Sequence, residues 1–200
     1  MLISGSIVAC NDPKGNVEND TPEEATEDTA VVYDDERSRV EADGAEIKAV
    51  GDDFWAGVNW DAPVVDDPDL KDSAVEVRAE TEYNIYTLDD KLLFDTDKAQ
   101  IRSEGEEKLR QVVKELKELP QNGQIRIFGH ADARAGNEYN KELSAERANA
   151  VKDWLQNKGG IAASRLSVEA MGESAPRATN ETARGRQLNR RVAIVAVTRE

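Results

Sequence analysis

The chain has 200 residues, of which 26 are Lys or Arg and 41 are Asp or Glu, and its formal net charge at pH 7 is −15. Residues 11–82 hold 23 acidic and 6 basic residues, whereas the rest of the chain holds 18 acidic and 20 basic residues. Neither part has the basic stripe that nucleic-acid binding requires, so nucleic acid is excluded as a partner. The nearly neutral remainder, residues 83–200, is long enough for one compact core.

The N-terminus carries the one cysteine, Cys10, which excludes an internal disulfide. It ends the apolar stretch "MLISGSIVAC", and no stretch of the chain is long enough to span a bilayer. The letters "IVAC" resemble a bacterial lipobox, in which the cysteine becomes the lipidated first residue of the mature protein. Residues 1–10 are therefore interpreted as part of a lipoprotein signal. The resemblance implies a lipid anchor at the periplasmic face of the outer membrane, and the alternative is a free cysteine in a loose N-terminus.

Residues 11–72 are rich in like charge and poor in apolar side chains, as in "NDPKGNVENDTPEEATEDTAVVYDDE". Such a segment cannot bury enough surface to offset its ordering entropy, so it is predicted to be a disordered tether. One patch departs from this composition, the segment Phe54–Trp60, which contains three aromatic residues. It is either a docking motif for a protein partner or a segment that folds back on the domain, and the sequence does not decide between them.

Residues 73–200 are predicted to form the folded domain. Alternating apolar residues indicate strands near 75–79 and 83–94. A capping box from Ser103 to Glu106 and an amphipathic stripe predict a helix that ends before Pro120.

The second half of the domain repeats this alternation of strand and helix. A strand "QIRIFGH" precedes a helix predicted to begin at Asn140, as its N-cap, and to close at Gly159. "RLSVEAMG" and "RRVAIVAV" are predicted as the last strands. The fold class is therefore α/β, an α+β sandwich with a mixed, partly parallel sheet and helices packed on one face.

Two opposite charges are predicted near one end of this sheet. Arg147 falls on the apolar face of the second helix, where a guanidinium is costly to bury unless it is paired. Asp132 leaves the C-terminal end of the preceding strand, where α/β sheets usually bind ligands. The residues alone leave three possibilities: an arginine that snorkels to water, a structural salt bridge, or two groups that each hold one pole of a zwitterion.

Four motifs resemble, in order and spacing, those of the OmpA-like peptidoglycan-binding domains, the family of the OmpA C-terminal domain and of Pal-like outer-membrane lipoproteins. They are "LLFDTDKAQI", "GHADARAGNEYNKELSAERANAVKDWL", "MGESAP" and "NRRVAI", and they cover roughly residues 83–198. The resemblance implies a periplasmic domain that binds the meso-diaminopimelate of the peptidoglycan stem peptide without cofactor or metal. Such a protein tethers the outer membrane to the cell wall.

The resemblance also implies a role for individual residues. Asp132 takes the ligand ammonium and Arg147 the adjacent carboxylate, with the fork geometry that favours arginine. Other expected ligand-binding residues are Asn140, Leu143, Asp95 and Arg191, the last of which is equally expected to hold the terminal strand against a loop. Ala131 replaces the usual Thr or Ser, which removes one hydroxyl near the site.

Two other functions are considered. An enzyme or a metal site would have to use His130, the only histidine, and no second histidine or nearby cysteine supports it, so no enzyme is expected. His130 is instead expected to pack and to hydrogen-bond at a strand end. The alternative function is an envelope interaction protein, a hub similar to Tol–Pal that docks a periplasmic partner through Phe54–Trp60.

Overall fold

A computed structural model of the chain describes residues 39–40, 46–47, 49–71 and 74–199, which belong to a unit spanning residues 34–200. Cys10 and most of the predicted tether lie outside the described residues. No helix within the described ranges is long and apolar enough to cross a membrane. The elements are β1 (Arg39–Val40), β2 (Glu46–Ile47), α1 (Asp52–Ala56), β3 (Val75–Ala79), β4 (Tyr83–Asp89), α2 (Asp90–Leu93), α3 (Ser103–Glu118), β5 (Ile125–His130), α4 (Asn137–Asn157), the 3₁₀ turn η1 (Ala163–Arg165), β6 (Leu166–Gly172), α5 (Ala183–Asn189) and β7 (Arg191–Val197).

The larger sheet has five strands in the order β3-β4-β7-β5-β6. Strands β5 and β6 are parallel, and α4 is the crossover helix that parallel neighbours require. The other neighbouring pairs are antiparallel. The sheet is therefore mixed and partly parallel, as predicted.

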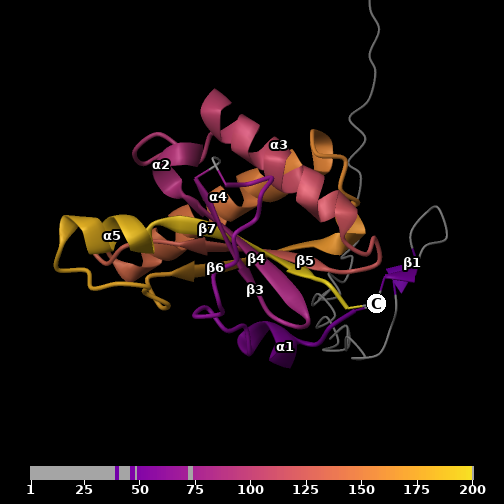
Figure 1. Cartoon of the computed structure of the whole chain (residues 1–200). Coiled ribbons are helices and arrows are strands. Elements are labelled where there is room, and N and C mark those ends of the chain that lie inside the picture. Colours follow the sequence, from indigo (N-terminus) through magenta and orange to yellow (C-terminus); the bar gives the residue numbers. More distant parts are fainter. Residues whose placement is uncertain (1–38, 41–45, 48, 72–73, 200) are drawn as a thin grey trace, which may run out of the picture. The chain divides into compact units, whose positions relative to one another are not determined.

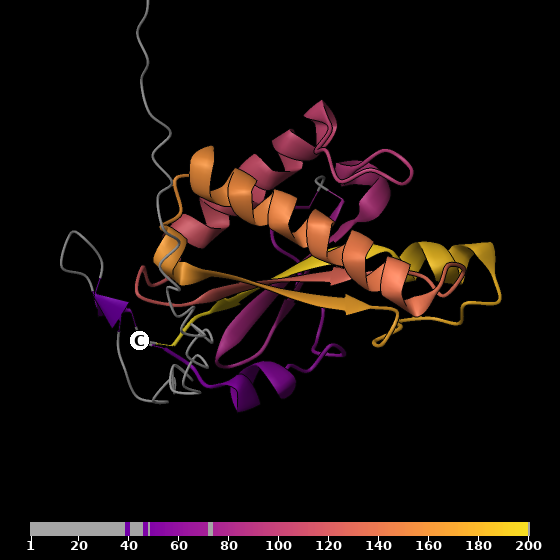
Figure 2. The same cartoon turned by 180° about the vertical axis from the view of Figure 1, so that it is seen from behind.

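Helices α3 and α4 cover one face of this sheet (Figure 1), and Figure 2 shows α4 crossing it beside β5 and β6. The main core lies between them and is built from alternate strand residues and the apolar stripes of both helices. Among its fully buried members are Leu109, Leu116, Ile127, Leu155 and Ile194. The predicted stripe of α3 therefore packs where its periodicity indicates.

The opposite face of the sheet is covered too, by the segment around α1 (Figure 1). Trp55 is only 3% exposed and its ring lies 6.4 Å from that of Phe128 on β5, measured between centroids. Trp60 packs edge-on against the same ring at 5.0 Å. These rings belong to a second core, on the α1 side of the sheet, which also includes Tyr83, Ile85 and Val195. The prediction that residues 11–72 form one disordered tether is thus wrong for 49–71, because aromatic side chains of this stretch fill the second core.

Two predicted N-caps are wrong. Helix α3 does begin at Ser103, but its N-cap is Arg102, no side chain in the described part of the chain caps it, and Glu106 pairs with Lys158 and Arg110. Helix α4 begins at Asn137 after the N-cap Gly136, so Asn140 lies inside the first turn. The short helices α1, α2 and α5 were not predicted, since four to seven residues carry too little periodicity to be seen.

Candidate functional site

A cavity of about 690 Å³ opens where the ends of β4 and β5 meet the start of α4. Five of the six residues predicted to bind the ligand line it: Asp95, Asp132, Asn140, Leu143 and Arg147. Its other lining residues are Asp90, Lys91, Phe94, Thr96, Asp97, Arg102, Ala131, Arg134, Ala135, Tyr139 and Arg190. The wall thus combines four carboxylates with five cationic side chains, a mixture that suits a ligand carrying both charges.

A close approach of α4 to β5 brings the two sides of this cavity together. A Cβ at Gly129 would lie 2.0 Å from the backbone oxygen of Ser144, so glycine is required there. The hydroxyl of Ser144 accepts a hydrogen bond of 3.1 Å from the N–H of Gly172, which fixes the helix to β6 as well. The loop after β5 and the first turns of α4 are therefore held in one place.

Asp132 is buried, and its carboxylate is held by two arginines. The backbone N–H of Arg134 donates to Oδ1 at 3.0 Å, and Nε of Arg134 donates to Oδ2 at 3.1 Å. Arg190 Nη1 donates to the same Oδ2. Burial opposes ionisation of Asp132, but these hydrogen bonds outweigh it and lower its pKa below the ordinary value, so the group is an anion at neutral pH.

Arg147 is also buried, at 4% exposure, and its ion-pair partner is Asp90 rather than Asp132. Nη1 of Arg147 donates to Oδ2 of Asp90 at 3.3 Å, and Nε donates to the carbonyl oxygen of Lys98 at 3.1 Å. The guanidinium lies 5.3 Å from the ring centroid of Phe94. Arg147 is therefore paired, as predicted for a buried arginine, but its partner Asp90 lies 57 residues earlier in the chain.

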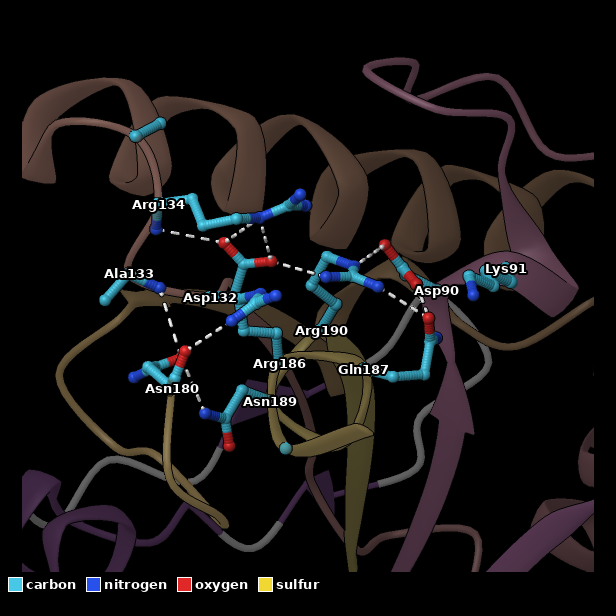
Figure 3. Close-up of polar contacts among 12 residues, drawn as sticks. Asp90, Lys91, Asp132, Ala133, Arg134, Asn180, Arg186, Gln187, Asn189 and Arg190 are labelled. Carbon is cyan, nitrogen blue, oxygen red and sulfur yellow. Dashed lines mark hydrogen bonds and ion pairs between the residues drawn. The ribbon is translucent and has the colours of Figure 1, made fainter. Parts of the chain in front are cut away.

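Arg190 links the two charged groups. It contacts Asp132 through Nη1 and Asp90 through Nε, the latter at 3.2 Å, and Figure 3 shows its guanidinium between the two carboxylates. Burial raises the pKa of Asp90, while the two arginines beside it oppose that shift. Asp132, Arg190, Asp90 and Arg147 therefore form a chain of alternating charge along the cavity.

Asn140 acts on the loop that carries Asp132. Its Nδ2 lies within hydrogen-bond distance of the carbonyl oxygens of Asp132, at 2.8 Å, and Ala135, and of Glu173 Oε2. These contacts tie the loop after β5 to the end of β6, so Asn140 positions Asp132. Asp95 is exposed at the cavity edge, where it pairs with Lys98 at 3.2 Å.

Arg191 does not line the cavity, so its placement in the ligand site is corrected. Side chains alternate along a strand, and Arg190 shares its side with Val192 and Ile194, which face α3 and α4. Arg191 shares the other side, and its guanidinium donates to the carbonyl oxygens of Asn189 and Ala175. It holds the terminal strand against a loop, which was the other role expected for it. Because the segment "RRVAIVAV" is apolar on both faces of the strand, its sequence does not show which face Arg191 occupies.

His130 is buried beside the ring of Trp60, with 5.2 Å between ring centroids, as expected of a packing residue. Neither ring nitrogen has a hydrogen-bond partner among the residues that the structure describes, so the expected hydrogen bond is not found there. Burial, with a smaller contribution from Arg191, lowers the pKa of His130 well below its ordinary value. Among the described residues no group of His, Cys, Asp and Glu side chains is arranged to hold a metal ion.

Residues 93–190 match the model of the OmpA family. The chain is also 32% identical to the cell wall anchor of the T6SS from Pseudomonas aeruginosa, whose structure superposes with a TM-score of 0.59 over 66% of this chain and 93% of that one. The chain therefore carries an OmpA-family domain.

Two further relatives are longer than the region they share with this chain. Outer membrane protein Omp38 of Acinetobacter baumannii is 34% identical over 131 residues, which are 66% of this chain and 36% of Omp38. The probable lipoprotein YiaD of Escherichia coli is 31% identical over 125 residues, 62% of this chain and 56% of YiaD. The chain thus matches about a third to a half of these proteins.

Proposed function

We propose that this OmpA-family domain binds peptidoglycan non-covalently and that its ligand is the free zwitterionic end of meso-diaminopimelate. The observation that carries the proposal is the chain of alternating charge along the cavity, with Asp132 at one end and Arg147 at the other. One terminal carbon of the ligand bears an ammonium and a carboxylate. A site with fixed charges of both signs binds that group without extensive rearrangement.

In the proposed complex Asp132 accepts from the ammonium, and Arg147 donates to the carboxylate. Arg190 contributes by holding Asp132 and Asp90 at a fixed separation. Leu143, half-buried in the cavity wall, contacts the aliphatic part of the ligand. The protein needs no catalytic group for this function, and we propose that it is not an enzyme.

The side chain of Arg134 is the group that the ligand ammonium displaces. It is 65% exposed and lies on the solvent side of Asp132, whereas Arg190 approaches the same carboxylate from a more buried position. Because the Arg134 side of this ion pair is screened by water, the pair contributes on the order of 1 kcal/mol, so its loss on binding opposes the ligand only weakly. The backbone N–H of Arg134 stays in place and keeps Asp132 oriented.

Sedimentation with purified diaminopimelate-type peptidoglycan tests the proposal. The wild-type chain is expected to pellet with the polymer, whereas Asp132→Asn and Arg147→Met are expected to stay in solution. Arg110→Gln is the matched control, because Arg110 is an exposed arginine of α3 that does not line the cavity. Thermal melts of all variants establish that they are folded, and pelleting of both cavity variants like the wild type would overturn the proposal.

We further propose that Cys10 is lipidated and anchors the chain at the periplasmic face of the outer membrane. The "IVAC" motif supports this, as does the likeness to a probable lipoprotein. In this proposal the acidic segment that follows Cys10 serves as the tether. Cys10→Ser is expected to move the protein from the membrane fraction to the soluble periplasmic fraction.

We do not retain the alternative of a Tol–Pal-like hub that docks its partner through Phe54–Trp60. The aromatic residues of this segment are buried or half-buried and are used inside the second core. A partner would have to pull them out of the domain before it could bind them.

A further inference from the structure

A second cavity, of about 280 Å³, lies on the α1 side of the sheet, and the function proposed above makes no use of it. Three arginines stand in its wall, so we call it the arginine cavity. Its lining residues are Trp60, Asp61, Arg78, Ile85, Thr87, Ala175, Pro176, Arg177 and Arg191. The volume is slightly below the range of about 300–1,000 Å³ typical of small-molecule sites, which suits a ligand of amino-acid size.

Two of the arginines share a single carboxylate. Nε of Arg78 donates to Oε1 of Glu76 at 2.7 Å, and Nη2 of Arg177 donates to Oε2 of the same residue at 2.7 Å. Arg78 also donates to the carbonyl oxygen of Ala62. One negative charge thus faces two positive ones at this edge of the cavity, which leaves a net charge of +1 on these three residues.

The third arginine, Arg191, is 5% exposed and forms no ion pair within the described part of the chain. Its guanidinium donates only to carbonyl oxygens, those of Asn189 at 3.3 Å and Ala175 at 3.2 Å. Burial lowers the pKa of Arg191 to about 10, so the group remains a cation at neutral pH. An unpaired buried charge is costly, and a bound anion would remove that cost.

The groups around Arg191 compensate its charge only in part. Glu76 favours the cation, but its carboxylate already accepts hydrogen bonds from Arg78 and Arg177. His130 pairs in register with Arg191 across β5 and β7 and is neutral, because burial holds its pKa low. The carboxylate that lines the cavity, Asp61, belongs to an exposed residue at its rim. Trp60, Ile85 and Pro176 add an apolar wall beside the cations.

We infer that the arginine cavity is a second binding site, which takes a small anion with carboxylate or phosphate oxygens. Arg191 and Arg177 donate to the oxygens, and the apolar part of the ligand packs on Trp60. The same oxygens occur at the C-terminus of a peptide and in a phosphate monoester. This site is independent of the zwitterion cavity, since Arg190 and Arg191 project to opposite faces of the sheet.

Fluorescence titration of the whole chain tests the inference, with Trp60 as the reporter. The probes are inorganic phosphate, N-acetylalanine, which has a free carboxylate, and N-acetylalanine amide, which has none, all at constant ionic strength. A saturable change with phosphate or N-acetylalanine is expected, and none with the amide. Which charged probe binds more tightly identifies the source of the oxygens.

Variants locate the binding. Arg177→Gln removes a hydrogen-bond donor from a partly exposed residue and is expected to weaken binding of the charged probe about tenfold or more. Arg110→Gln, on the exposed side of α3, is the matched control and should leave the affinity unchanged. Arg191→Met should abolish binding of the charged probes. If Arg191→Met does not fold, the affinity of Arg177→Gln alone tests the site. The inference is overturned if neither charged probe gives saturation, or if Arg177→Gln and the wild type bind the charged probe with equal affinity. Arg177→Gln should still pellet with peptidoglycan like the wild type.

Discussion

Replacement of Trp55 by alanine tests whether the segment before β3 is part of the folded domain. The indole is 3% exposed, packs against Phe54 at 5.2 Å and Phe128 at 6.4 Å, and has the guanidinium of Arg126 at 4.6 Å from its ring. Truncating a buried tryptophan in this way removes about 3–5 kcal/mol from the free energy of unfolding. A loss of that size lowers the Tm of a domain of this length by roughly 6–20 °C.

Urea unfolding of the whole chain, followed by far-UV circular dichroism, measures this loss without depending on the fluorescence of the residue removed. The matched control is Val64→Ala, a truncation in the same segment at a side chain that is 59% exposed, which should change stability by less than about 0.5 kcal/mol. If the segment were disordered, the two variants would have equal stability. If Trp55→Ala were as stable as Val64→Ala, the second core would not contribute to stability and the reasoning would be refuted.

Three further outcomes are expected. The pKa of His130 is lowered in the fold, so unfolding takes up a proton below pH 6.5. The free energy of unfolding should therefore fall by up to about 1.4 kcal/mol for each pH unit below that value. In thermal melts from pH 7 to pH 5, His130→Phe should lose this pH dependence. Arg134→Gln frees Asp132 for the ligand ammonium and should tighten binding of diaminopimelate-type muropeptides up to about fivefold by calorimetry, and weaker binding would show that Arg134 contacts the ligand. Gly129→Ala forces α4 away from β5 and should destabilise the domain by at least about 2 kcal/mol in urea; an unchanged midpoint would contradict the close contact with Ser144.

The sequence predicted the long elements because their apolar residues repeat with the period of a helix or a strand. Strands β3, β5, β6 and β7 and helices α3 and α4 all follow such patterns. For the α1 segment the sequence left two alternatives open, docking of a partner or folding back on the domain, and the structure shows the second. The apolar residues of this segment are few, irregularly spaced and surrounded by acids, so composition indicated disorder while three aromatic rings were enough to cover a sheet face.

The candidate site was predictable only in part. Arg147 stands out because it is a charge on an apolar helix face, and Asp132 because it follows a strand end where α/β sheets usually bind ligands. Asp90 gives no such local signal, since its role depends on contact with residues 57 and 100 positions later. Arg191 was predicted in the site and Arg190 was not, because an uninterrupted apolar strand does not show which of its two faces lies toward the helices.

The proposed recognition of a zwitterion is tested most directly by calorimetric titration of the whole chain with three soluble muropeptides. They should carry diaminopimelate, diaminopimelate with its free carboxylate amidated, and lysine in its place. The first is expected to bind, and the other two to bind about 5–150-fold more weakly, because each leaves Arg147 without its carboxylate partner, a loss of about 1–3 kcal/mol. Equal affinity for all three would contradict recognition of the carboxylate by Arg147.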